Sequence, residues 1–176
     1  MSGRAHLRTV PVPPCRRSPP RRAGAVACAL ASVLLAAGCS DTVSLDAPTL
    51  SGSDAKACAA LVAALPDRVA DQPEREADPG DGYGAAWGDP AIELRCGVPR
   101  PKDLTRTASC QVANGVGWFV PEEQQTGRPE DITMTTVGRA QYVEVRVPEE
   151  YFPPTTAMVD LGPALKRTIR SVKPCV

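Results

Sequence analysis

Histidine is almost absent from this sequence, since His6 is the only one among 176 residues. A Ser-His-Asp triad, a Cys-His pair and a histidine metal site all need an imidazole as base or ligand. Because His6 lies in a basic leader that we expect to be removed, none of these sites can form in the remaining chain. Carboxylate chemistry, a Ser-Lys dyad or a role without catalysis remain.

The sequence also lacks an apolar run long enough for a permanent membrane span at its N-terminus. The apolar run at residues 23–37 follows six arginines and has about 15 residues, whereas a helix needs about 20 to cross a bilayer. A basic segment followed by a short apolar one is typical of a signal peptide. We therefore expect residues 1–38 to form an export signal rather than a retained transmembrane helix.

The end of this signal has small residues directly before a cysteine, in the sequence LLAAGCS. This order resembles the lipobox of bacterial lipoproteins, in which the cysteine thiol is joined to diacylglycerol before cleavage. We expect Cys39 to carry the lipid, because two or more acyl chains hold a protein stably on a membrane. The predicted location is the extracytoplasmic face of the cell membrane, reached through the N-terminal lipid. Ordinary cleavage, which releases a free secreted protein, is the alternative.

A clustered basic stretch is missing once the leader is removed. Loss of its six arginines leaves 14 basic and 20 acidic residues, a formal charge of −6. Nucleic acids and anionic membrane surfaces are bound through clustered basic side chains. We therefore predict no nucleic-acid partner, and attachment to the membrane by lipid rather than by charge.

Four cysteines remain in the exported chain, namely Cys58, Cys96, Cys110 and Cys175. An even number of cysteines in an exported protein predicts two disulfides, with three possible connectivities. We expect Cys58–Cys175, which would join the two ends of the domain, and Cys96–Cys110, which would join neighbouring strands. No C-x-x-C pair is present, so we predict neither a metal site nor a cofactor.

Two segments have the apolar spacing of a helix, 54–65 and 161–171. Ser51 or Ser53 would cap the first helix and Pro66 would stop it, while Pro163 would lie in the first turn of the second. Their apolar stripes are Cys58, Leu61, Val62 and Leu65 in the first, and Leu161, Leu165, Ile169 and Val172 in the second.

Period-two alternation of apolar and polar residues predicts strands at 92–98, 108–112, 116–120, 132–137 and 142–147. Cys96 should face the core, and a buried, bridged sulfur is a poor nucleophile. We expect a mobile loop at the charged, turn-rich segment 67–84, and a lipidated tether at 39–52 that need not fold. The prediction is an α+β domain over 53–176, with two layers: a mainly antiparallel four- to five-stranded sheet, and both helices on one face of it.

Two short motifs are formally present without the context that their chemistry needs. Ser53-x-x-Lys56 is the acylation motif of penicillin-recognising enzymes, but neither S-D-N nor K-T-G follows it. Asp78, Asp81 and Asp89 suggest calcium, but glycines stand where an EF-hand loop needs oxygen ligands. We interpret these residues as a helix start and a solvated loop.

The fragments AWGDPAIELRCGVPRP, NGVGWF, GRAQYVEVRVPEEY and VDLGPAL together resemble the actinobacterial domain-of-unknown-function family 3515, over about residues 55–175. Members of that family are mostly small exported or lipid-anchored proteins. The resemblance implies an envelope protein of a high-GC Gram-positive bacterium. It brings no catalytic residues to this chain.

These observations predict a membrane-anchored cell-envelope lipoprotein that acts as a non-catalytic binding or accessory module, with an envelope protein or a wall glycan as partner. Some of the following residues must be core, and the others are candidates for the ligand surface: Trp87, Asp89, Trp118, Phe119, Tyr142, Tyr151 and Phe152. The alternative is a hydrolase of wall glycans that uses Asp89 with Glu122 or Glu123.

Overall fold

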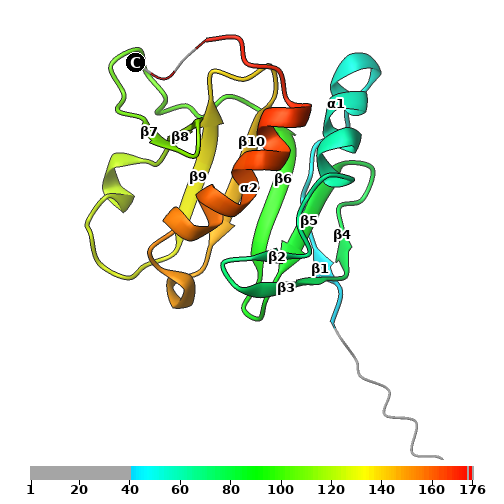
Figure 1. Ribbon diagram of the computed structural model, residues 1–176, viewed down its shortest axis with the longest axis horizontal. Coiled ribbons are helices and arrows are strands. Elements are labelled where there is room, and N and C mark those ends of the chain that lie inside the picture. The colour runs from blue at the N-terminus through cyan, green and yellow to red at the C-terminus, as the bar shows by residue number, and fades with distance from the viewer. Residues whose placement is uncertain (1–40, 174, 176) are drawn as a thin grey trace, which may run out of the picture. The chain divides into compact units, whose positions relative to one another are not determined.

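The computed structural model describes residues 41–173 and 175, and it confirms the α+β fold class (Figure 1). The predicted signal peptide and the lipidation residue Cys39 lie outside these residues. Two α-helices are present in the described part, α1 (Gly52–Val62) and α2 (Thr155–Thr168), with short 3-10 helices at Glu122–Gln124 and Glu149–Tyr151. None of the helices in 41–173 is long and apolar enough to cross a membrane.

Over the described residues the main sheet has eight strands, in the order β2-β3-β5-β6-β10-β9-β8-β7, so the expected four or five strands were too few. Every pairing in it is antiparallel. A separate parallel pair joins β1 and β4. The strand bounds are β1 Val43–Ser44, β2 Arg68–Val69, β3 Gln72–Arg75, β4 Ala77–Asp78, β5 Tyr83–Trp87, β6 Ile92–Val98, β7 Gln111–Ala113, β8 Val116–Phe119, β9 Ile132–Val137 and β10 Tyr142–Val147.

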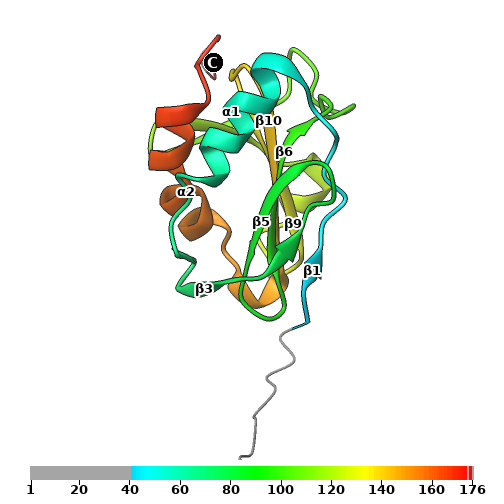
Figure 2. The same cartoon turned by 90° about the vertical axis from the view of Figure 1, so that its right-hand side faces the viewer.

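The centre of the sheet follows the period-two pattern of the sequence. Along β6 the side chains alternate strictly between buried and half-buried, and Cys96 faces the core as predicted. β10 pairs with β6 so that Val145 lies opposite Leu94, which places their apolar sides on one surface. Both helices cover this surface (Figure 2). The two-layer arrangement with both helices on one face is thereby confirmed.

α2 begins six residues earlier than predicted, so Pro163 lies inside the helix rather than in its first turn. Proline has no N–H to donate to the carbonyl four residues earlier, which is that of Val159. The side chain of Asn114, at the β7–β8 turn, donates to the Val159 carbonyl at 3.1 Å instead. The helix therefore continues past Pro163 because another segment supplies the missing donor.

The segment predicted as an unfolded tether packs against the sheet over its described part. Leu45 is buried, and β1 pairs with β4. A Cβ at Gly84 would lie 2.7 Å from Leu45 Cδ1, and a Cβ at Gly97 would lie 2.4 Å from Leu50 Cδ1. These glycines leave room for the two leucines, and so the chain lies on the face opposite the helices (Figure 2).

The segment expected to be a mobile loop, 67–84, is also built into the fold. It contains β2, β3 and β4, and β3 pairs with β5, where Glu74 lies opposite Trp87. Asp160 of α2 accepts a hydrogen bond from the backbone N–H of Ala70 at 2.9 Å. The charged side chains of this segment mark an edge of the sheet with one solvated face rather than a free loop.

Both predicted disulfide pairings are wrong, although all four cysteines are bridged. The bonds are Cys58–Cys96 and Cys110–Cys175. The inward face of β6 lies under α1, so Cys96 meets Cys58 on the buried side of that helix. The C-terminal segment runs beside β8, where a Cβ at Gly117 would lie 2.7 Å from the Cβ of Cys175. There Cys175 reaches Cys110, which directly precedes β7.

Replacing both members of the buried disulfide, in Cys58→Ala/Cys96→Ala, should lower the free energy of unfolding by about 4 kcal/mol, because it opens a loop closed over 38 residues. Urea unfolding without reductant measures this loss. Non-reducing peptide mapping of the unaltered protein should recover Cys58 linked to Cys96, and a Cys58–Cys175 peptide would contradict the structure.

Asn114→Asp should lower the free energy of unfolding by about 1 kcal/mol, because aspartate keeps the backbone conformation but cannot donate to the Val159 carbonyl. In a Pro163→Ala background the helix regains its own donor, so the same substitution should cost much less. A double-mutant cycle measured by urea unfolding tests this coupling. An equal loss of unfolding free energy in the two backgrounds would rule out the interpretation that Asn114 replaces the N–H that Pro163 lacks.

Candidate functional site

The two tryptophans among the predicted surface residues belong to the core. Trp87 and Trp118 are both fully buried on the helix side of the sheet. The indole Nε1 of Trp87 donates to the carbonyl of Pro66 at 3.0 Å, which fixes the chain just after α1. Large apolar side chains gain most from burial, so both residues stabilise the fold and neither can form a ligand platform.

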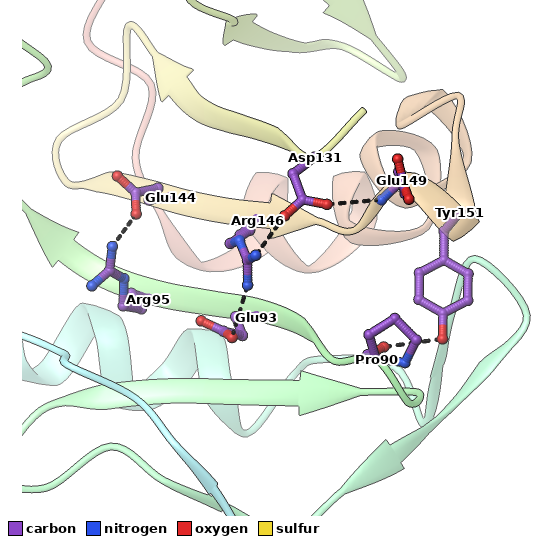
Figure 3. Close-up of polar contacts among 8 residues, drawn as sticks. All are labelled: Pro90, Glu93, Arg95, Asp131, Glu144, Arg146, Glu149 and Tyr151. Atoms are coloured by element: carbon purple, nitrogen blue, oxygen red, sulfur yellow. Dashed lines mark hydrogen bonds and ion pairs between the residues drawn. The ribbon is translucent and has the colours of Figure 1, made fainter. Parts of the chain in front are cut away.

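Asp89 and Tyr151 lie together at the β5–β6 turn, and both have partners within the chain. The Tyr151 hydroxyl donates to the carbonyl of Pro90 at 3.0 Å (Figure 3). Asp89 is highly exposed and forms an ion pair with Arg75 at 3.3 Å. Phe152, which follows Tyr151, is half-buried and packs against the core. This cluster closes one end of the sheet.

A groove crosses the sheet face opposite the helices, and of the predicted aromatic residues it contains Phe119. Its volume is about 610 Å³. The rim comes from the N-terminal segment, through Asp46 and Pro48, and from the 99–103 loop. Its floor is formed by side chains of four neighbouring strands, namely Arg95, Glu144, Thr133, Thr135 and Phe119. The segment that was predicted to be a tether thus supplies one wall of the groove.

Ion pairs cover the outer face of β6 and β10 in and beside this groove. Arg95 pairs with Glu144, and Arg146 lies between Glu93 and Asp131 (Figure 3). Asp131 also accepts a hydrogen bond from the backbone N–H of Glu149 at 3.1 Å. Two arginines lie beside three carboxylates, so the face is polar and its charges nearly balance. Such a surface suits recognition through hydrogen bonds and shape.

The carboxylates of the hydrolase alternative lie far apart. Asp89 follows β5, and Glu122 and Glu123 follow β8, with β6, β10 and β9 between these strands. Four strand spacings amount to roughly 19 Å, whereas the two carboxyl groups of a glycosidase lie about 5–9.5 Å apart. Among residues 41–173 and 175, no group of three or more His, Cys, Asp or Glu side chains is arranged to hold a metal ion.

Tyr142 lies at the start of β10, away from Phe119, and lines a second hollow of about 420 Å³. This hollow is formed by the 100–110 loop, the β9–β10 turn and the segment after α2. The residues predicted for the ligand surface therefore lie in different places. Phe119 lies in the groove, Tyr142 lies in the second hollow, and Asp89 and Tyr151 lie at the end of the sheet opposite that hollow.

Arg139 in the β9–β10 turn forms part of the second hollow, and sequence reasoning missed it. Only 9 % of this residue is exposed. Its Nη1 donates to the carbonyls of Leu165 and Ile169, at 3.2 and 2.7 Å, at the C-terminal end of α2. Burial lowers the pKa of the Arg139 guanidinium, while the negative end of the helix dipole favours its charge.

Comparison with known proteins gives a match to one family model. The family model described as "Protein of unknown function (DUF3515)" matches residues 23–174, which is most of the chain. No curated protein and no solved structure matches it.

Proposed function

This chain belongs to the DUF3515 family of proteins of unknown function, and on that premise we propose that it is a membrane-anchored lipoprotein of the cell envelope with a non-catalytic binding role. The sequence LLAAGCS, the short apolar run before it and the disulfides of the domain support this proposal. Disulfides persist in exported proteins, where the surroundings are oxidising. The anchor is a lipid on Cys39, at the extracytoplasmic face of the membrane.

The binding surface is the groove on the open sheet face, and this single observation carries the binding role. The groove is built from five separate stretches of the chain, so the fold holds its shape. It offers hydroxyl, guanidinium and carboxylate groups beside the prolines of its rim. A partner protein of the envelope fits this mixed lining best. Phe119 is almost fully buried, so a wall glycan, which would need an exposed aromatic platform, is the second choice.

A non-catalytic role is favoured over hydrolysis of wall glycans by the positions of the carboxylates. Asp89 is far from Glu122 and Glu123, and the carboxylates on β6 and β10 are paired with arginines. The mature chain has no histidine to act as base.

Cys39→Ala should abolish incorporation of radiolabelled palmitate, because it removes the thiol that accepts the lipid. Globomycin should cause the unprocessed form of the unaltered chain to accumulate. Cys28→Ala, which removes a thiol from the leader and leaves LLAAGC intact, is the matched control and should keep the label. Absence of label on the unaltered protein, or its retention in Cys39→Ala, would contradict the anchor.

A photocrosslinking amino acid at Lys102, on the rim of the groove, should capture one reproducible envelope protein in intact cells. The same probe at Lys56, an exposed position on α1, is the control for contacts of the other face. Mass spectrometry of the adducts identifies what each position touches. A glycan adduct at Lys102 would contradict a protein partner and favour a wall glycan as the ligand. Identical adducts at both positions would refute a specific role for the groove.

A further inference from the structure

Among the residues that the structure describes, the second hollow is lined by four basic side chains, Arg100, Arg106, Arg139 and Lys173, and by no acidic one. We propose that this basic hollow binds a phosphate-bearing ligand, a role that does not depend on the groove or on the lipid anchor. The mature chain has a formal charge of −6, so a site with only positive charges is opposite in sign to the net charge of the molecule. A local field of this kind concentrates anions.

The charges of the basic hollow are not neutralised within the described part of the chain. Ion pairs there involve Arg75, Arg95 and Arg146, and none of the four basic residues of the hollow takes part in one. An anion can therefore enter without breaking an existing pair. The groove differs in this respect, because Arg95 on its floor already pairs with Glu144.

The basic hollow combines a fixed floor with an adaptable rim. Arg139 is held by the carbonyls at the end of α2, and Arg100 donates to the carbonyl of Leu104 within the 100–110 loop. Arg106 and Lys173 are exposed, and no hydrogen bond of their side chains is seen within 41–173. Two anchored guanidinium groups thus set the position of an anion, and two free cations can close on it.

The chemistry of the lining favours phosphate over a carboxylate. Guanidinium groups match the oxygens of phosphate with two parallel hydrogen bonds, and several cations balance a group that carries up to two negative charges. Tyr142 and Thr105 add hydroxyl groups to the lining. A volume of about 420 Å³ accommodates a phosphate with a small organic substituent.

The phosphate belongs either to a small soluble phosphate compound or to a lipid headgroup, since both present negatively charged phosphate oxygens. Asp41, the first described residue, lies at the other end of the sheet from the basic hollow. Arg75 donates both to the carbonyl of Asp41 and to that of Gly88, which places Asp41 at the β5–β6 turn. Tyr142 pairs with Val98 at the far end of β6, about six residue steps or 20 Å away.

Calorimetric titration of the full chain in non-ionic micelles, at low salt, tests the site. The probes are pyrophosphate and glycerol 3-phosphate for the free source, and dihexanoyl phosphatidylglycerol for the lipid headgroup. Arg106→Gln/Lys173→Gln should weaken binding about tenfold or more, because it removes two cations from the rim. Lys56→Gln/Arg128→Gln makes the same change in net charge at exposed positions outside the hollow, and should leave affinity within about twofold.

Amide shifts in a ¹⁵N-labelled sample locate the probe even if a variant fails to fold. The amides of Arg106, Ala108 and Gly138 should move on titration, and that of Gly80 should not. If Arg106→Gln/Lys173→Gln loses affinity for the soluble phosphates alone, or for the lipid headgroup alone, the result supports the site and identifies the kind of ligand that carries the phosphate. No binding of any probe, equal loss with the control variant, or shifts confined to other regions would overturn it.

Discussion

The Cys58–Cys96 disulfide is the covalent link between the helical layer and the centre of the sheet, and the arrangement of α1 on the sheet follows from it. α1 buries Cys58 and Leu61, and an isolated helix of its length is only marginally stable, so the helix depends on its attachment to the sheet. The bond ties it to the inner face of β6, while Leu50 packs against Gly97 from the outer face. Consecutive residues of one strand thus hold the chain on both sides of the sheet. Residues 46–48, which form one wall of the groove, lie between Leu45 and Leu50, and both leucines pack beside glycines of the sheet.

Local patterns were sufficient to predict the central part of the fold. The alternation in 92–98 and in the 132–147 hairpin follows directly from burial of one sheet face, and the structure places both as expected. The α+β class with two helices on one face was predicted for the same reason, and the family was recognised from four short fragments. These features depend on neighbours in the sequence, which a periodic pattern records.

Features set by contacts between distant segments were missed. Nothing near Leu45 and Leu50 shows that Gly84 and Gly97 leave space for them, so their segment resembled a free tether. The cysteine pairing depends on which face of β6 meets α1, and the sequence does not state this. Burial of Trp87 and Trp118 removed two candidates for the ligand surface. The basic hollow escaped notice because its arginines and lysine come from three separate segments.

Docking of β1 beside β4 also decides how a lipidated form would stand on its bilayer. Only Ser40 and two further residues separate Cys39 from Val43, where the pairing begins, which gives a reach of roughly 14 Å. So short a connection would keep this edge of the domain close to the bilayer and would limit how far the domain could rotate. In such a form the β5–β6 turn would lie at the end of the sheet nearer the headgroups, because Arg75 joins this turn to Asp41.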